Sequence, residues 1–170
     1  MSLRLTHHVL QCRLATPLGA MTATRSVRGL SGLWFDAQKH HPGALDLPSA
    51  SDDAVFAQLR AALRAYFEGQ GLPQDLALDP QGTPFQQQVW QALLAIPAGD
   101  SRSYGQLARQ LGRPLAVRAL GAAVGRNPLS ILIPCHRALG AGGALTGYAG
   151  GLARKTALLR LEGASFKEAD

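Results

Sequence analysis

The chain has 170 residues, of which 46% are hydrophobic and 16% charged, a composition that argues against a disordered or fibrous protein. No apolar run approaches the roughly 20 residues that span a bilayer, and the N-terminus lacks the continuous apolar stretch of a secretory signal, so we expect a cytoplasmic protein with no membrane partner. The net charge of +6 lies wholly in residues 80–170, which favours a nucleic-acid partner, with a solvated basic surface as the alternative.

The N-terminal part of the chain predicts a small unit of strands followed by one helix. Residues 4–35 have the pattern of short strands, with turns expected at 17–19 and 29–32. Residues 52–67 then carry apolar side chains at helical spacing, and the helix is expected to stop at Gly69.

Two segments rich in glycine and proline, 69–73 and 79–82, mark the expected domain boundary. We therefore expect one domain at residues 1–80 and a second at residues 81–170.

Sequence signals for three helices follow. The segments 83–86 and 103–106 are capping boxes, the first with proline at the first helical position. These open helices that end near Pro97 and Gly112, and a third helix is expected from about 114 to 125. Two short helices joined by a tight turn resemble a helix-turn-helix. The side chains expected to face inward are Phe85, Val89, Leu93, Leu107, Leu111, Val117, Leu120 and Val124.

The third helix has a second stripe, formed by Arg118, Gly121, Ala122 and Gly125 at helical spacing. Each glycine costs a helix on the order of 1 kcal/mol. Such a cost indicates that something approaches the backbone closely, and the pattern alone leaves open whether that is another helix or a ligand such as DNA.

A single cysteine follows this helix at a position suited to chemistry. Residues 129–133 form an apolar run that predicts a buried strand, and Pro134 should end it. Cys135 comes next, then His136 as a potential base and Arg137 as a positive charge that favours thiolate. Without context, a cysteine in such a place is more often a small buried hydrophobe.

Residues 138–151 contain six glycines and one aromatic side chain, Tyr148, and predict a flexible or closely approached loop. A last helix is expected at about 151–161, before Glu162. Its exposed basic residues are expected to be Arg154, Lys155 and Arg160.

From residue 83 to 163 the ordered motifs resemble those of the O6-alkylguanine-DNA alkyltransferases, the methylated-DNA–protein-cysteine methyltransferases. The motifs are Phe85-Gln-Gln-Gln-Val-Trp90, Ser103-Tyr-Gly-Gln-Leu-Ala108, Arg118-Ala-Leu-Gly121, Arg126-Asn-Pro128, Ile133-Pro-Cys-His-Arg137, Gly147-Tyr-Ala-Gly-Gly151 and Leu159-Arg-Leu-Glu-Gly163. The resemblance implies an α+β protein, with an N-terminal ribonuclease-H-like α/β domain and a C-terminal winged helix-turn-helix-like, mainly helical domain.

The resemblance also implies a role for each residue of a catalytic set. Cys135 would accept the alkyl group, and His136 would be its base through a water, oriented by Glu162. Asn127 would brace the turn between the recognition helix and the active-site strand. Tyr104 would help to drive the target nucleotide out of the duplex and donate a proton or hydrogen bond to the leaving base.

Further residues are expected at the DNA and around the base. Arg118 would take the place of the extruded nucleotide in the base stack. The other expected DNA contacts are Tyr104, Gly121, Ala122, Arg126 and Arg137. The expected lining of the base pocket is Tyr148, Ala149, Val124 and Pro134. Val124 departs from the pattern, since many relatives carry a polar residue there, and this departure would affect the preferred alkyl size or the pocket shape.

The function implied is irreversible repair, in one turnover, of O6-alkylguanine in double-stranded DNA by a monomer that needs no cofactor and no metal, with O4-alkylthymine as a second candidate substrate. Two alternatives stay open: a non-catalytic lesion or promoter binder, and a cysteine hydrolase that uses Cys135, His136 and Glu162.

Some relatives bind zinc in the N-terminal domain, but this chain offers little to hold it there. Cys12 is the one cysteine in that domain, and adjacent histidines on a strand, such as His7 and His8, point to opposite faces. Solvated or disordered histidine pairs at 7–8 and 40–41 are the simpler interpretation.

Overall fold

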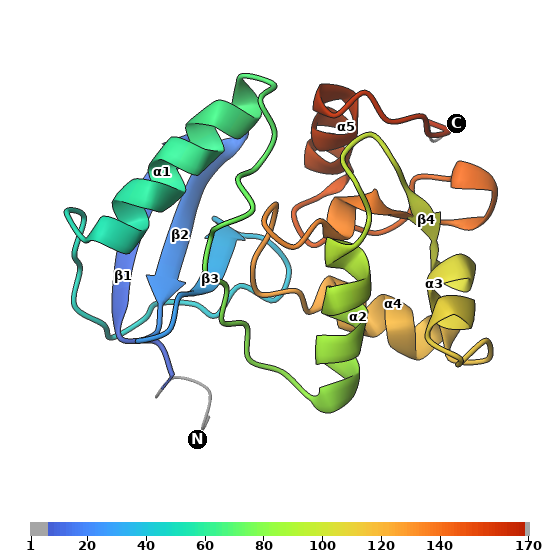
Figure 1. Ribbon diagram of the computed structural model, residues 1–170, viewed down its shortest axis with the longest axis horizontal. Coiled ribbons are helices and arrows are strands. Elements are labelled where there is room, and N and C mark those ends of the chain that lie inside the picture. The colour runs from blue at the N-terminus through green and yellow to red at the C-terminus, as the bar shows by residue number, and fades with distance from the viewer. Residues whose placement is uncertain (1–6, 169–170) are drawn as a thin grey trace. The chain divides into compact units, whose positions relative to one another are not determined.

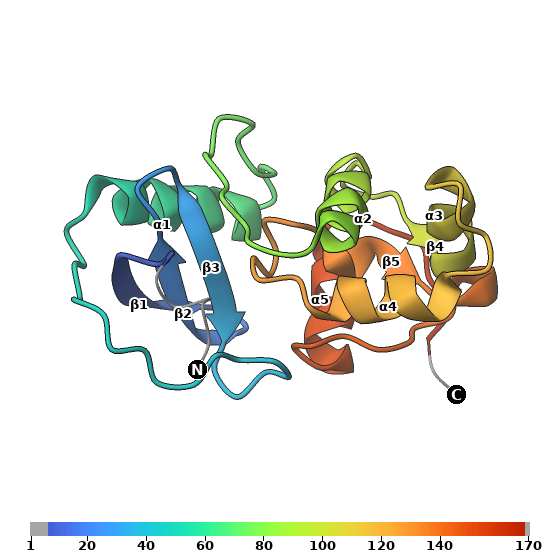
Figure 2. The ribbon, with the colours of Figure 1, turned by 90° about the horizontal axis from the view of Figure 1, so that it is seen from below.

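A computed structural model describes residues 7–168 of the chain. The chain forms two compact units, one made of Met1–Gln81 with Pro128–Ser130 and the other of Gly82–Asn127 with Ile131–Asp170. Figure 1 and Figure 2 show strands with one long helix in the first unit and mostly helices in the second, as an α+β class requires.

The first unit is a three-stranded antiparallel sheet with a helix packed along it (Figure 1). Its strands, β1 (Leu10–Thr16), β2 (Gly19–Arg25) and β3 (Leu30–Phe35), pair in chain order. The helix α1 (Ala54–Phe67) begins after Asp53, whose carboxylate accepts a backbone N–H of the first turn. The fully buried side chains of this unit include Met21, Ala23, Leu33, Phe35, Phe56 and Leu59.

The second turn of the sheet lies earlier than the expected position of 29–32. The chain reverses where the Ser26 N–H donates to the Gly29 carbonyl at 2.9 Å, and β3 follows at once. Gly32 is therefore a strand residue, and a Cβ there would lie 1.9 Å from a ring carbon of Trp34. That glycine makes room for the indole ring and does not form a turn.

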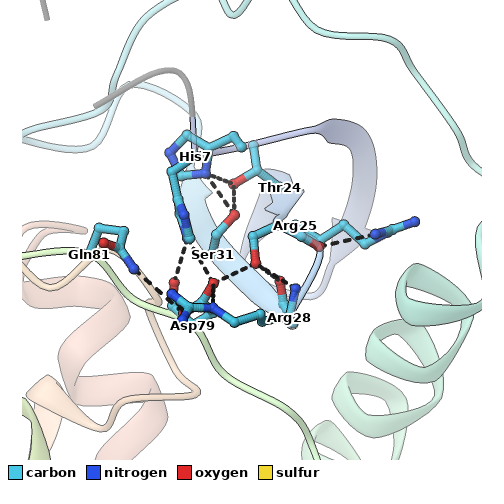
Figure 3. A network of polar contacts seen from close by, with 10 residues as sticks. His7, Thr24, Arg25, Arg28, Ser31, Asp79 and Gln81 are labelled. Atoms are coloured by element: carbon cyan, nitrogen blue, oxygen red, sulfur yellow. Dashed lines mark hydrogen bonds and ion pairs between the residues drawn. The ribbon is translucent and has the colours of Figure 1, made fainter. Parts of the chain in front are cut away.

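The two N-terminal histidines make hydrogen bonds within the first unit, and Figure 3 shows His7 in this network. The expectation of a solvated or disordered pair at 7–8 is therefore wrong. His7 Nε2 lies 2.9 Å from an Asp79 carboxylate oxygen, and that carboxylate also accepts from the Ser26 hydroxyl. His8 Nδ1 lies 2.7 Å from the Ser31 hydroxyl. Burial first, and then the neighbouring His7, lower the pKa of His8.

The second unit begins with two helices at the capping boxes. Thr83 and Ser103 cap α2 (Pro84–Leu94) and α3 (Tyr104–Gln110) with the reciprocal bonds that the sequence predicts. Just before α3, the short strand β4 (Arg102–Ser103) pairs in parallel with β5 (Ala138–Leu139), further along the chain.

The helix α4 (Val117–Gly125) follows α3 after a turn, which gives the helix-turn-helix arrangement. It starts three residues later than expected, because residues 113–116 form the turn, with the Ala116 N–H donating to the Arg113 carbonyl. Val117 stands at the first helical position and is 39% exposed, so its inward placement was wrong. The remaining inward positions of α4, Leu120 and Val124, are buried.

The apolar run 129–133 is buried but is not a strand. Leu33 of β3 donates to the Pro128 carbonyl at 2.8 Å and accepts from the Ser130 N–H at 3.0 Å, a single bridge. Ile131 then adopts a φ of 72°, in the left-handed region, and this conformation ends any extended pairing.

The chain then passes through three short elements, η1 (Cys135–Arg137), β5 (Ala138–Leu139) and η2 (Ala141–Gly143). Its last helix, α5 (Leu152–Leu161), follows them.

Candidate active site

The candidate nucleophile is held by an amide from the end of α4. Cys135 is the first residue of η1 and is 5% exposed. Asn127 Nδ2 donates to its Sγ at 3.1 Å and to the Ile133 carbonyl at 2.8 Å. Asn127 lies two residues after Gly125, where α4 ends. Its side chain makes both bonds, so it fixes the thiol and also the backbone that carries it.

His136 and Arg137 share one buried carboxylate. His136 Nε2 lies 2.8 Å from Glu162 Oε1, and Arg137 donates from Nε and Nη2 to both oxygens of Glu162 at 2.9 and 2.8 Å. Arg137 also donates to the carbonyl of Ile96. The Glu162 side chain is 2% exposed, so this network is removed from solvent.

The sequence suggested Arg137 as a DNA contact, but the folded chain directs its guanidinium at Glu162. Arg137 is 8% exposed and its fork is occupied by Glu162. Its charge is also not directed at the thiol, since the carboxylate of Glu162 neutralises it.

The hydrogen bond to Glu162 sets the tautomer of His136. With Nε2–H donating to the carboxylate, the lone pair lies on Nδ1, and Nδ1 is buried with no hydrogen-bond partner in the described part of the chain. Burial is the main reason that the pKa of His136 is lowered; Glu162 raises it, and Arg137 and Lys155 lower it. The imidazole is thus neutral at pH 7 and able to take a proton.

The thiol of Cys135 is protonated at rest. Burial raises its pKa, and the hydrogen bond from Asn127 and the charge of Lys155 offset this only in part. The positive charge near the thiol thus comes from Lys155, a residue that sequence reasoning placed on the exposed face of the last helix.

Lys155 is fully buried, so its expected exposure was wrong. Its Nζ donates to the carbonyls of Ala138, Thr146 and Gly147 at 2.6, 2.8 and 3.1 Å. Burial lowers its pKa from 10.5 to about 8, so the ammonium is largely charged at pH 7. A signal existed in the sequence: Lys155 shares a helical stripe with Leu158 and Leu159, both of which are buried.

Tyr104 begins α3 and lies in the same region. Lys155 Nζ lies 6.0 Å from the centre of its ring, and its hydroxyl bonds to the Thr146 side chain. Burial raises the pKa of Tyr104, with a smaller contribution in the same direction from the charge of Cys135. The phenol keeps its proton at neutral pH and can act as a donor.

The small-residue stripe of α4 faces open space. Arg118 and Ala122 are exposed, and Gly121 and Gly125 are half-buried. A Cβ built on either glycine would meet no atom within 4 Å. Among the described residues there is therefore no neighbour for which these two glycines make room. Arg126, at the end of α4, is also exposed.

The four residues expected around the base all lie in the second unit. Val124 and Pro134 are buried, and Tyr148 and Ala149 are half-buried. Val124 lies next to Ala123, whose carbonyl accepts from Trp90 Nε1 at 2.9 Å and so ties α4 to α2. A joint role for the four as a base pocket stays a prediction.

Comparison with known proteins accounts for nearly the whole chain. Residues 10–80 match the family "6-O-methylguanine DNA methyltransferase, ribonuclease-like domain", and residues 84–164 match "6-O-methylguanine DNA methyltransferase, DNA binding domain". The chain belongs to the 6-O-methylguanine DNA methyltransferase family. The predicted pairing of an N-terminal ribonuclease-like domain with a C-terminal DNA-binding domain is thereby confirmed.

Two curated relatives of this methyltransferase-family chain carry the name methylated-DNA–protein-cysteine methyltransferase. That of Mycobacterium bovis is 46% identical over 147 residues, which are 86% of this chain and 88% of the relative. That of Methanosarcina acetivorans is 41% identical over 150 residues, 87% and 94% of the two chains.

Solved structures similar to this family member include Mycobacterium tuberculosis OGT in complex with DNA. It has a TM-score of 0.83 and 43% identity, covering 91% of this chain and 93% of that one. A structure of the M. tuberculosis O6-methylguanine methyltransferase has a TM-score of 0.80 and 44% identity, covering 90% and 92%.

Every candidate catalytic residue of this methyltransferase-family chain lies within the part matched as the DNA-binding domain, residues 84–164. Between residues 7 and 168, no helix is long and apolar enough to cross a membrane.

Proposed function

We propose that this protein repairs DNA by direct reversal, moving the alkyl group of O6-alkylguanine from double-stranded DNA onto Cys135 in a single irreversible turnover. The observation that carries this proposal is the buried thiol, held by Asn127 and followed by a neutral His136 that Glu162 orients. The names of the curated relatives, methylated-DNA–protein-cysteine methyltransferases, support the reaction class.

The base acts at the moment of reaction, because Cys135 is protonated at rest. Its S–H proton passes through a water to His136 Nδ1, whose lone pair no described side chain or backbone group engages. The imidazolium that forms is stabilised by Glu162 at 2.8 Å. Lys155 lowers the cost of the thiolate through its charge.

The transfer step is a substitution at carbon. The sulfur of Cys135 forms a bond to the alkyl carbon while the bond from that carbon to O6 breaks, and the electron pair stays on the guanine. Tyr104, a phenol with a raised pKa, donates a hydrogen bond or proton to the departing base. The product thioether has no good leaving group, so water does not restore the thiol and each molecule reacts once.

The lesion must leave the base stack to reach a buried sulfur, at a cost of a few kcal/mol. The exposed stripe of α4 fits this step, because Gly121, Ala122 and Gly125 let a DNA backbone approach. Arg118, exposed on the same face, takes the vacated place in the stack, and Tyr104 crowds the nucleotide from α3. Arg126 supplies a further positive charge at the end of α4.

The proposed substrate range follows from the residues expected around the base. A buried Val124 beside the end of α4 gives an apolar boundary that suits the alkyl group of O6-alkylguanine, with Pro134, Tyr148 and Ala149 as the rest of the wall. O4-alkylthymine presents a similar carbon and is a second substrate of the proposal. The protein acts as a monomer and without a cofactor or metal.

The test is the intact mass of the protein after incubation with duplex DNA that contains O6-methylguanine. The proposal predicts a stoichiometric gain of one methyl group in the wild type, located on Cys135 by peptide mapping, and no gain in Cys135→Ser. Binding with an unchanged mass would support a non-catalytic lesion binder, and repeated turnover on an ester or amide would support a cysteine hydrolase.

A further inference from the structure

One edge of the N-terminal sheet is open over β1. Gln11 directs its backbone away from β2: its N–H donates to the Pro48 carbonyl and its carbonyl accepts from the Ala50 N–H, both at 3.0 Å. Backbone groups alternate sides along a strand, so Arg13 and Ala15 direct their N–H and C=O groups to the same outer edge. No backbone hydrogen bond from the described chain reaches these two residues on that side.

A groove with a volume of about 530 Å³ lies beside this edge, between β1 and α1. Its apolar lining includes Leu14 from β1, Pro17 from the hairpin, and Leu63 and Phe67 from α1. Figure 1 shows α1 running beside the strand. The groove thus offers apolar pockets next to a row of unpaired backbone groups, all within the first unit.

The rim of the groove is basic, although the N-terminal part of the chain is neutral overall. Residues 1–79 contain seven Lys or Arg and seven Asp or Glu, yet three arginines line this groove, against Glu68 as the one acidic residue of its lining. Arg13 is paired with Asp36, and Arg60 donates to a backbone carbonyl. Arg64 is exposed and has no ion-pair partner in the described chain.

We propose that this groove binds an extended acidic peptide segment of a partner protein, added as a fourth strand to the free edge of β1. The unpaired edge offers both donors and acceptors at the spacing of a strand, and a peptide backbone satisfies both kinds. The phosphates of a nucleic-acid backbone offer acceptors alone, so they would not pair with the carbonyls of Arg13 and Ala15. Arg60 and Arg64 select acidic side chains, and the apolar lining takes alternate residues of the peptide.

Two labelled octapeptides probe this directly, one alternating Glu and Val and the other alternating Lys and Val, with binding followed by fluorescence anisotropy. The acidic peptide should bind the wild type and the basic one should not. Arg64→Glu replaces an attraction for acidic side chains with a repulsion and should weaken binding of the acidic peptide about tenfold. Lys39→Glu, an exposed charge change outside the groove lining, should leave it unchanged.

Strand addition has its own signature in the backbone. On binding of the acidic peptide, the amides of Arg13 and Ala15 should exchange with solvent more slowly by nuclear magnetic resonance. Ala15→Pro removes one edge donor and should abolish binding, whereas Ala15→Val keeps the N–H and should preserve it. Thermal unfolding checks that each variant is folded, and alkyl transfer from free O6-benzylguanine should be unchanged in all of them.

Three results would overturn the proposal. The first is equal binding of both peptides, or of neither. The second is equal affinity in Ala15→Pro and Ala15→Val. The third is a loss of affinity for duplex DNA in Arg64→Glu that matches the loss for the peptide, which would assign the groove to nucleic acid.

Discussion

A buried thiol is a poor nucleophile until a base takes its proton, and the side chains around Cys135 determine when that happens. Burial raises the pKa of the thiol and lowers that of His136, so both are neutral in the resting protein. Glu162 orients the imidazole, and Arg137 holds Glu162 by a two-pronged contact. The site is thus set to transfer a proton once an electrophile is in place.

The orienting role of Glu162 predicts a loss of rate on substitution. Glu162→Gln removes the charge that stabilises the imidazolium and leaves Arg137 without its carboxylate, so alkyl transfer from free O6-benzylguanine should slow by about 100-fold. Single-turnover kinetics measure this, with thermal unfolding to separate rate from stability. Glu168→Gln, an exposed carboxylate paired with Arg160, is the matched control. A rate equal to that of the control would show that Glu162 has no part in proton transfer.

Lys155 predicts a pH dependence of stability. Its pKa falls from 10.5 to about 8 on folding, so between these values the unfolded chain binds more protons than the folded one, and the free energy of unfolding must rise with pH. Measured by urea unfolding, the wild type should gain stability relative to Lys155→Met, in which this group is absent, from pH 8 to pH 10.5. The gain should be on the order of 3 kcal/mol. A relative decrease over this range would mean that the buried ammonium is favoured by folding.

At the scale of single residues, the sequence indicated Cys135 and His136 because they are adjacent and follow an apolar run. It failed for Arg137 and Lys155, which were expected on the surface and are both buried. A basic side chain is exposed by default. A basic side chain can be buried where a carboxylate or several carbonyls accept its hydrogen bonds. Those acceptors, on residues such as Glu162 and Thr146, come close to Arg137 and Lys155 only in the folded chain.

Among the elements, α4 joins the two halves of the proposed function. One face contributes Leu120, Ala123 and Val124 to the core, and the opposite face carries Arg118 and the small residues. A glycine that no neighbour requires still costs the helix stability. The face therefore has a composition that folding alone does not explain, and the proposed close approach of DNA would explain it.

This interpretation of α4 predicts opposite effects of one substitution. In Gly121→Leu the new side chain meets no atom of the free protein at its Cβ, so thermal stability should be unchanged or higher, by up to about 1 kcal/mol. Affinity for duplex DNA, measured by anisotropy, should fall at least about tenfold. Ala61→Leu, on the exposed side of α1, is the control and should affect neither. Full DNA affinity in Gly121→Leu would remove α4 from the DNA interface.

Helix and strand boundaries could be predicted where a local sequence motif marks them. The capping boxes at Thr83 and Ser103 gave the starts of α2 and α3 to the residue, since the cap itself fixes the boundary. The start of α4 was missed because Ala116 provides no side-chain cap. The run 129–133 was mistaken for a strand because any buried segment is apolar, whether or not it pairs as a strand. No sequence motif marks the left-handed φ of Ile131.

Over the whole molecule, the candidate catalytic residues and the excess positive charge both lie in the C-terminal half of the chain. The excess of Lys and Arg lies in residues 80–170, the same part that carries the thiol, the base and the α4 stripe. The fold class could be predicted from the ordered motifs. The free edge of β1 could not, because it begins where residues 48–50 stop pairing with the strand, after Gln11. No local pattern encodes that point.

A protein that keeps the alkyl group is consumed as it works, and the most direct test is a titration of repaired lesions against protein. With duplex DNA containing O6-methylguanine in large excess, the number of guanines restored should rise to one per molecule of active protein and then stop, however long the incubation lasts. A count that continues to grow with time would show that Cys135 is regenerated and would contradict the account.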